Sequence, residues 1–351
     1  MGCAGSKDQG VGAKAIKDNF STFKGVQEAL RSAGLEGSNL LLAIDFTASN
    51  QLAGKKTFDD RSLHDPGNPP NPYKESIMAI ANTLSSFDED GKVHVYGFGD
   101  ARTHASDCFS FNANDAPCHS LEEVLTRYTQ VLPRLDLSGP TSFAPVIYEA
   151  CKVVERSGHG YHILVIIADG GITGSGIASG GPLSPNERDT IDAIIAASNL
   201  PLSIVMIGVG DGPWDTMNKL DDKVKGRKFD NFQFVDFSKS KQKYPNDETR
   251  SLANFAKKAL QEIPHQYKIV TSLGYVGATN KPSVVPPQWR EKRPLNPPDY
   301  DGPDVPPPAP GGAPGYPPAT GASAYPAVGG AANPYPAVNP PAANPYPTVQ
   351  N

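Results

Sequence analysis

Oxygen-bearing side chains follow an apolar run near the start of this sequence. Asp45, Thr47 and Ser49 stand at alternating positions directly after the run 40–44, LLLAI. Such a run predicts a buried strand of a parallel sheet. Ligands bind at the carboxyl ends of parallel strands, and carboxylate and hydroxyl oxygens are the ligands that Mg²⁺ prefers. The pattern therefore predicts a metal site rather than a nucleotide loop or a catalytic nucleophile.

Two further oxygen ligands stand in comparable places. Asp169 follows the apolar run 161–168, and Thr141 precedes a predicted helix that starts near Phe143. Taken singly, either residue could be a helix cap. Taken together, the loops of a doubly wound sheet can bring all five side chains to one edge. We predict that they bind Mg²⁺, with Mn²⁺ and Ca²⁺ left open, and that one coordination position accepts an acidic side chain of a partner protein.

Apolar strands alternate with amphipathic helices through the main part of the chain. Strands are predicted at 40–44, 93–98, 161–168, 202–209 and 232–237, with a short edge strand at 108–111. Helices are predicted at 15–33, 73–87, 121–132, 143–155, 186–198, 213–220 and 249–263. Continuously apolar strands are typical of a sheet that is covered on both faces. The order indicates an α/β domain with a largely parallel, doubly wound sheet.

The first seven residues read MGCAGSK and match the pattern for myristoylation of Gly2. Cys3 stands beside it and could carry a palmitoyl chain. Two such signals matter, because a single myristoyl chain binds membranes only marginally. We expect anchoring at the cytoplasmic face of the plasma membrane or an endomembrane, with a cytoplasmic pool and the nucleus as further locations. The alternative is a chance match in an unstructured start.

Composition excludes several classes of function. The net charge of −5 gives no reason to expect nucleic acid as a partner. The four cysteines show no C-x-x-C spacing, so we expect neither a zinc site nor a disulfide framework, and a reducing compartment fits. No apolar run approaches the length of a membrane-spanning helix.

Six strings carry a resemblance to a known family. They are AIDFTASN, FDEDGKVHVYGFGDA, SGPTSFAPVI, YHILVIIADGGIT, LPLSIVMIGVGDGPWD and FDNFQFVDF. In this order they resemble the von Willebrand factor A domain of the copine family, over about residues 33–267. Within that family the chain is most similar to plant RING-type ubiquitin ligases that carry a copine-like domain.

The resemblance implies a Rossmann-like, six-stranded sheet with one antiparallel edge strand. It also implies a metal site in which Thr47, Ser49 and Thr141 touch the ion, while Asp45 and Asp169 act mainly through water. Thr47 replaces the serine of the general A-domain pattern but keeps its hydroxyl.

Two features of these relatives are missing from the 351 residues. Copines usually carry two calcium-dependent lipid-binding domains ahead of the A domain, whereas only about 35 residues precede it here. A RING holds two zinc ions mostly through thiolates, and no cysteine follows Cys151. We therefore expect neither calcium-triggered membrane docking nor ligase activity from this sequence.

Residues 281–351 differ in composition from the rest. They contain 21 of the 35 prolines and few large aliphatic residues, which predicts a disordered tail with polyproline II character. Tyr-Pro recurs as a candidate docking array at Tyr316, Tyr325, Tyr335 and Tyr346.

The segment Pro297-Pro298-Asp299-Tyr300 matches the PPxY ligand of WW domains. It predicts docking of WW-domain or other proline-binding proteins, among them HECT-type ubiquitin ligases that carry WW domains. The alternative is that the segment is only part of a spacer.

These observations lead to one interpretation with two alternatives. Residues 1–14 would carry the lipid, residues 15–280 would form the A domain, and residues 281–351 would be the docking tail. We expect an intracellular, non-enzymatic adaptor that binds partner proteins through Mg²⁺. The alternatives are a component of protein ubiquitination and a domain that binds anionic phospholipid directly.

Overall fold

The computed structural model describes residues 22–88 and 90–302. The predicted lipidation residues Gly2 and Cys3 lie outside them, as does the predicted tyrosine array at 316–346. Among the described residues, no helix is both long enough and apolar enough to cross a bilayer.

One six-stranded sheet forms the centre of the fold, in the order β3-β2-β1-β4-β5-β6. The strands are β1 (Asn39–Asp45), β2 (His94–Phe98), β3 (Phe109–Ser110), β4 (His162–Ala168), β5 (Leu202–Gly208) and β6 (Phe232–Asp236). Only the β2–β3 pair is antiparallel. The predicted α/β class and its antiparallel edge strand are thus confirmed. The chain runs outward from β1 to β3 and then returns to β4, so β1 and β4 are neighbours at the topological switch point.

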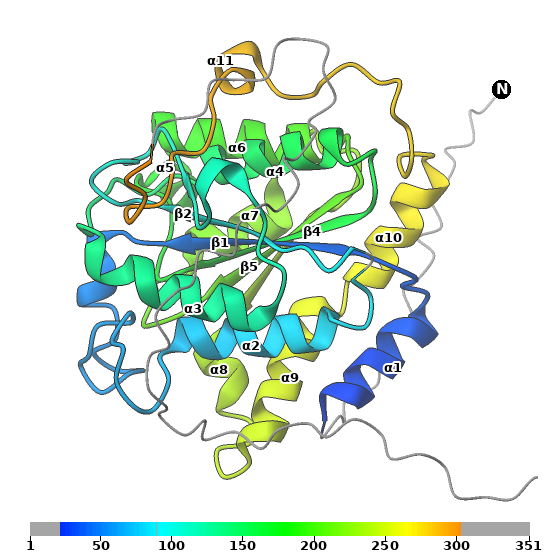
Figure 1. The fold of residues 1–351 in the computed structure, drawn as a ribbon. Helices are drawn as coiled ribbons and strands as arrows, with labels where there is room; N and C mark the ends of the chain where they lie inside the picture. Colours follow the sequence, from blue (N-terminus) through cyan, green and yellow to red (C-terminus); the bar gives the residue numbers. More distant parts are fainter. Residues whose placement is uncertain (1–21, 89, 303–351) are drawn as a thin grey trace, which may run out of the picture. The chain divides into compact units, whose positions relative to one another are not determined.

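Helices cover both faces of the sheet (Figure 1). They are α1 (Phe23–Ala33), α2 (Pro72–Leu84), α3 (Leu121–Val131), α4 (Ala144–Arg156), α5 (Gly176–Ser179), α6 (Pro185–Ala197), α7 (Asp215–Lys223), α8 (Phe237–Lys241), α9 (Glu248–Leu260), α10 (Ile263–Ser272) and α11 (Pro287–Arg290). Short 3-10 turns occur at Ala48–Gln51, Ala113–Asp115 and Leu132–Arg134. The last predicted helix, 249–263, corresponds to α9, and a further helix that was not predicted, α10, follows it.

The strand period divides the core into two layers. Leu42 and Ile44 of β1 pack in the layer that contains α1, α2, α3, α9 and α10. Leu41 and Ala43 point the other way, toward α4, α6 and α7. Successive strand residues face opposite sides, so the apolar run predicted from sequence is buried on both faces. Asp45 at its end is fully buried as well.

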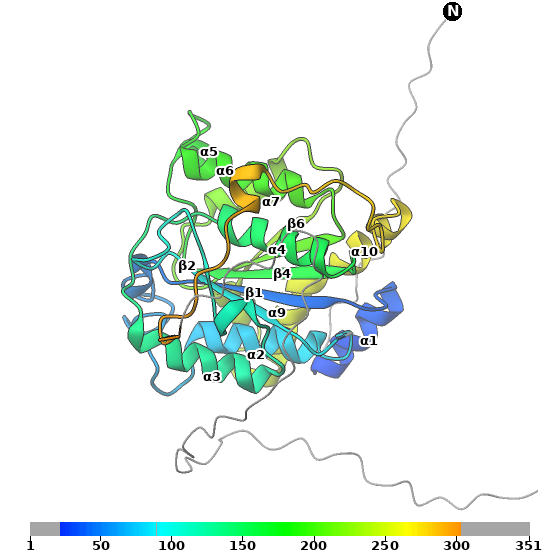
Figure 2. The same ribbon diagram turned by 45° about the horizontal axis from the view of Figure 1, so that its top comes forward.

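Residues 281–302, here called the strap, differ from the prediction. The sequence assigned them to an unfolded tail, but they pack on the domain and belong to the same compact unit. Val285 is buried, and the Trp289 ring stacks on Tyr148 with centroids 5.2 Å apart. Figures 1 and 2 show the strap in orange, passing from α10 over α4 and α6 toward the β2–β3 side of the sheet. The prediction that the disordered tail starts at residue 281 is therefore wrong for residues 281–302. These residues pack on the domain because the domain supplies the apolar surface that the strap itself lacks.

Close packing between β2 and β3 gives a first prediction. Gly97 lies opposite Phe109, and a Cβ at Gly97 would collide with the buried Phe109 ring. We expect Gly97→Val to lower the free energy of unfolding by about 1–3 kcal/mol, because the ring has no free space to enter. Urea denaturation measures this change. Gly170→Ala is the control, since its Cβ would meet nothing within 4 Å; an equal loss in both variants would contradict the packing argument.

Candidate functional site

Four of the five predicted site residues meet at the switch point of the sheet. Asp45 is the last residue of β1, and Asp169 directly follows β4, the neighbouring strand. Thr47 and Ser49 belong to the turn that leaves β1. Parallel strands bring their carboxyl ends to one edge, which explains why residues 120 positions apart come together.

A chain of hydrogen bonds connects these four residues. The backbone N–H of Thr47 donates to Oδ1 of Asp45 at 2.8 Å. The hydroxyls of Thr47 and Ser49 are 2.9 Å apart, and Ser49 Oγ donates to Oδ1 of Asp169 at 3.1 Å. The two hydroxyls therefore stand between the two carboxylates.

Thr141 reaches the site through the backbone of its loop. The N–H of Ala48 donates to the carbonyl of Ser138 at 2.6 Å, and Thr141 exchanges hydrogen bonds with Thr173 at 2.8 and 3.0 Å. In the described residues, no hydrogen bond joins the Thr141 side chain to the other four. Thr141 is also not a helix cap, because the N-cap position of α4 is Phe143.

The two carboxylates are buried and electrostatically unfavourable as they stand. Asp45 is fully buried and Asp169 is 3% exposed. Burial raises the pKa of Asp169 to about 6. Burial, and then the nearby charge of Asp169, raise the pKa of Asp45 well above its usual value. The Oδ2 atom of each carboxylate is buried without a hydrogen-bond partner. Buried anions with unpaired oxygens need a compensating charge, and a cation fits this requirement.

The available oxygens fit a hard cation. The described residues hold no cluster of three or more His, Cys, Asp or Glu side chains that could bind a metal. The site instead combines two carboxylates with hydroxyls, which are ligands that suit Mg²⁺, Mn²⁺ or Ca²⁺ better than softer metals.

Asn50 and Tyr73 hold the backbone of the site in place through hydrogen bonds, and neither role was predicted from sequence. The Asn50 amide donates to the carbonyl oxygens of Asp45 and Thr47 at 3.3 and 3.1 Å. The Tyr73 hydroxyl in turn donates to Oδ1 of Asn50 at 2.6 Å. Both supporting residues are fully buried, so they fix the backbone that presents the hydroxyls.

His64 is a second supporting residue, and it arises from a segment predicted only as a loop. Its Nε2 lies 2.8 Å from the carbonyl of Asp45, and its Nδ1 lies 2.7 Å from the Tyr128 hydroxyl. A carbonyl only accepts, so Nε2 carries the proton and Nδ1 accepts from Tyr128. Burial lowers the pKa of His64 to about 4, which keeps the ring neutral at physiological pH. Nothing local in the sequence distinguishes it from the other histidines.

Gly99 lets β2 end close to the site. Its φ is +84°, and a Cβ would collide with the Thr47 side chain and lie 3.3 Å from Oδ1 of Asp45. Only glycine tolerates both conditions.

The copine family model matches residues 62–278. The E3 ubiquitin-protein ligase RGLG2 of Arabidopsis thaliana is 50% identical over 287 residues, which are 82% of this chain and 60% of that protein. Copine family protein 1 of Caenorhabditis elegans is 42% identical over 275 residues, which are 78% of this chain and 23% of that protein. The chain thus spans about 60% of the length of RGLG2.

Among solved structures, the D319A mutant of the PilB minor pilin from Streptococcus sanguinis aligns with a TM-score of 0.43 and 11% identity. The alignment covers 67% of this chain and 64% of that chain. This likeness is too low to support a functional conclusion.

The buried carboxylate pair leads to a prediction about metal and pH. A carboxyl whose pKa rises on folding opposes the folded state once the pH exceeds its ordinary pKa. At neutral pH a bound cation offsets this cost, so we expect Mg²⁺ to raise the melting temperature. The increase should shrink as the pH falls through about 6, the pKa of Asp169, because protons then compete with the cation. Calorimetry with Mg²⁺ or EDTA measures both effects.

Asp45→Asn tests where the cation acts. The amide oxygen can still accept from Thr47, so the metal-free protein should be at least as stable as wild type, but the response to Mg²⁺ should vanish. Asp59→Asn removes the same charge from a carboxylate that is 93% exposed and serves as the matched control. A wild-type response to Mg²⁺ in Asp45→Asn would place the ion elsewhere.

Proposed function

Because the chain belongs to the copine family, we propose that it is a membrane-anchored intracellular adaptor that binds partner proteins through a divalent cation. The residues that would hold the cation are Asp45, Thr47, Ser49, Thr141 and Asp169. The observation that supports this proposal is the pair of buried carboxylates with unpartnered Oδ2 atoms, bridged by two hydroxyls. Mg²⁺ would supply a position for a carboxylate of the partner.

The rim of the site also suits a protein partner. Leu52, just beyond the Ser49 turn, is 64% exposed. The loop that follows is held firmly, because the Asp211 carboxylate accepts from the backbone N–H groups of Lys56 and Thr57 at 3.0–3.2 Å. An exposed apolar side chain next to the turn that carries Ser49 would add contact area for a partner that presents an acidic residue.

Attachment to the membrane would come from Gly2 and Cys3, through the acylation pattern of the sequence. These residues lie outside the described part, so the anchor and the location at the cytoplasmic face of a membrane rest on the sequence pattern alone.

Partner capture tests the adaptor proposal. Wild type, Asp45→Asn and Asp59→Asn are used to capture proteins from cell lysate, each with Mg²⁺ and with EDTA. We expect a set of partners that is lost with EDTA and lost with Asp45→Asn. Asp59→Asn should keep this set, because Asp45 belongs to the site and Asp59 does not. Mass spectrometry identifies the set. An identical set in all six samples would contradict docking through the cation.

A second candidate function is participation in protein ubiquitination. It is favoured by the relatives named E3 ubiquitin-protein ligases, which are 47–53% identical to the chain. The route we propose is indirect, through a ligase recruited by the PPxY motif.

Purified chain, mixed with ubiquitin and its activating and conjugating enzymes, distinguishes the two functions. We expect no ubiquitin chains in this mixture, and we expect them on addition of a WW-domain ligase. Chains formed without that ligase would contradict the non-enzymatic adaptor.

A further inference from the structure

The strap carries the PPxY motif, and the residues just before it are paired with the edge of the sheet. The N–H of Leu295 donates to the carbonyl of Cys108 at 2.8 Å, and its carbonyl accepts from Ser110 at 2.9 Å. Leu295 thereby forms a parallel bridge with Phe109 of β3. Addition of an extended segment to a sheet edge is a common mode of peptide binding.

The next residues are held by side chains of the domain. The N–H of Asn114 donates to Oδ1 of Asn296 at 2.8 Å, and Arg102 donates to the Asn296 carbonyl at 3.1 Å. Pro297, the first proline of the motif, is buried. The docked segment therefore continues from the sheet edge directly into the motif.

The variable position of the motif makes the strongest contact. Arg127 of α3 donates from both terminal nitrogens to the two carboxylate oxygens of Asp299, each at 2.7 Å. Its Nε also donates to the carbonyl of Phe111 at 2.8 Å, which fixes the guanidinium in place. The two side chains are 17% and 19% exposed. A bidentate, partly buried pair of this kind is specific in geometry as well as in charge.

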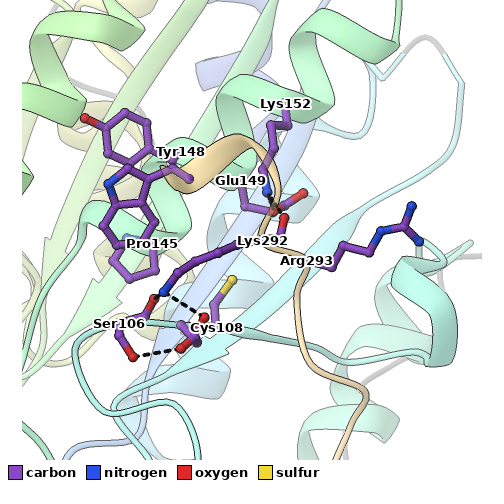
Figure 3. A pocket seen from close by; sticks show the side chains of 10 residues that line it. Ser106, Cys108, Pro145, Tyr148, Glu149, Lys152, Lys292 and Arg293 are labelled. Carbon is purple, nitrogen blue, oxygen red and sulfur yellow. Dashed lines mark hydrogen bonds and ion pairs between the residues drawn. The ribbon is translucent and has the colours of Figure 1, made fainter. Parts of the chain in front are cut away.

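The strap is also seated upstream of the motif (Figure 3). The Lys292 ammonium donates to the carbonyl of Ser106 at 2.6 Å and to Asp107 at 3.1 Å. The Lys152 ammonium, paired with buried Glu149, donates to the carbonyl of Lys292 at 2.7 Å. The space left between the strap and α4 at this point is about 10 Å³, room for one water at most.

The docked motif has the wrong shape for a WW domain. The N–H of Tyr300 donates to the carbonyl of Pro297 at 3.1 Å, which closes a turn across the motif. WW domains bind such ligands as a polyproline II helix, which has no internal hydrogen bonds and a solvated backbone. Because Pro297 is buried and the motif is folded into a turn, a WW domain can engage it only after the segment leaves the domain.

We infer that the domain carries a cis docking site for residues 292–300, and that this site competes with WW domains for the PPxY motif. The site consists of the β3 edge, the loop at Asn114 and the Arg127 side chain. The inference rests on the proposed recruitment through PPxY. The docking site would make the motif available to a WW domain only in the fraction of chains in which residues 292–300 are released.

With such competition, the apparent affinity of the full chain for a WW domain equals the affinity of the free motif multiplied by the fraction of chains in which the segment is released. If about one chain in ten is released, binding weakens about tenfold relative to the free motif. Loss of the Arg127–Asp299 pair should raise the released fraction and restore most of the affinity for the WW domain.

The test compares the full chain with a synthetic peptide of residues 290–302, using calorimetry and a recombinant WW domain that binds PPxY ligands. We expect the peptide to bind about tenfold more tightly than the full chain. Arg127→Ala, which leaves the motif unchanged, and Asp299→Ala, which changes only its variable position, should move the full chain toward the peptide. Arg61→Ala is the control for removal of an arginine, and Tyr300→Ala should abolish binding in both formats.

Two outcomes contradict different parts of the argument. Equal affinity of peptide and full chain, unchanged by Arg127→Ala, would overturn the cis docking site while leaving PPxY recruitment intact. A peptide that does not bind the WW domain would overturn the recruitment itself, and the competition with it.

Hydrogen exchange gives an independent reading. The backbone N–H groups of Leu295 and Ser110 should exchange slowly in wild type and faster in Arg127→Ala or with excess WW domain. Fast exchange of both groups in the wild type would show that the segment is not docked and would overturn the inference.

Discussion

Two carboxylates buried at the ends of neighbouring parallel strands are the constraint around which the structure is arranged. Burial removes the Asp45 and Asp169 carboxylates from bulk solvent, and each keeps one oxygen without a hydrogen-bond partner. Such an arrangement costs stability unless a positive charge compensates it. The fold tolerates the pair because a large two-layer core holds β1 and β4 in register. The supporting contacts explain how a site that opposes folding is still held in one geometry.

The support comes from neutral groups rather than from counter-charges. Asn50 and His64 donate to carbonyl oxygens of the β1 turn, and a lowered pKa keeps His64 uncharged. A cationic histidine at this place would itself neutralise the carboxylates and reduce their attraction for a metal ion. The His64 ring is stacked between the rings of Phe46 and Tyr73, with centroid distances of 4.9 and 4.2 Å. This burial favours the neutral form of the ring. The scaffold thus leaves the negative charge available to a ligand.

The sequence predicted what depends on local pattern. The apolar runs before Asp45 and Asp169 predicted buried strands, and the oxygen-bearing side chains after them were candidate ligands. The fold joins four of these side chains, Asp45, Thr47, Ser49 and Asp169, in one hydrogen-bonded chain. His64 escaped prediction because its role depends on contacts with Asp45 and Tyr128, which are distant in sequence. Asn50 escaped because its orientation depends on the distant Tyr73. The strap escaped for a similar reason. A segment of this composition cannot form a core of its own. Only the folded domain provides the surface on which Val285 is buried and the strand edge with which Leu295 pairs.

The strap has a consequence for solubility. A sheet edge with unpaired N–H and carbonyl groups invites pairing with another chain, and proteins commonly cover such edges. Here Leu295 caps β3 by bonding to Cys108 and Ser110. The copine family model ends at residue 278, so a protein trimmed to that boundary would lose this cover and leave the carbonyl of Cys108 and the N–H of Ser110 unpaired at an open edge. The segment outside the family boundary is thus expected to protect the folded domain from self-association through this edge.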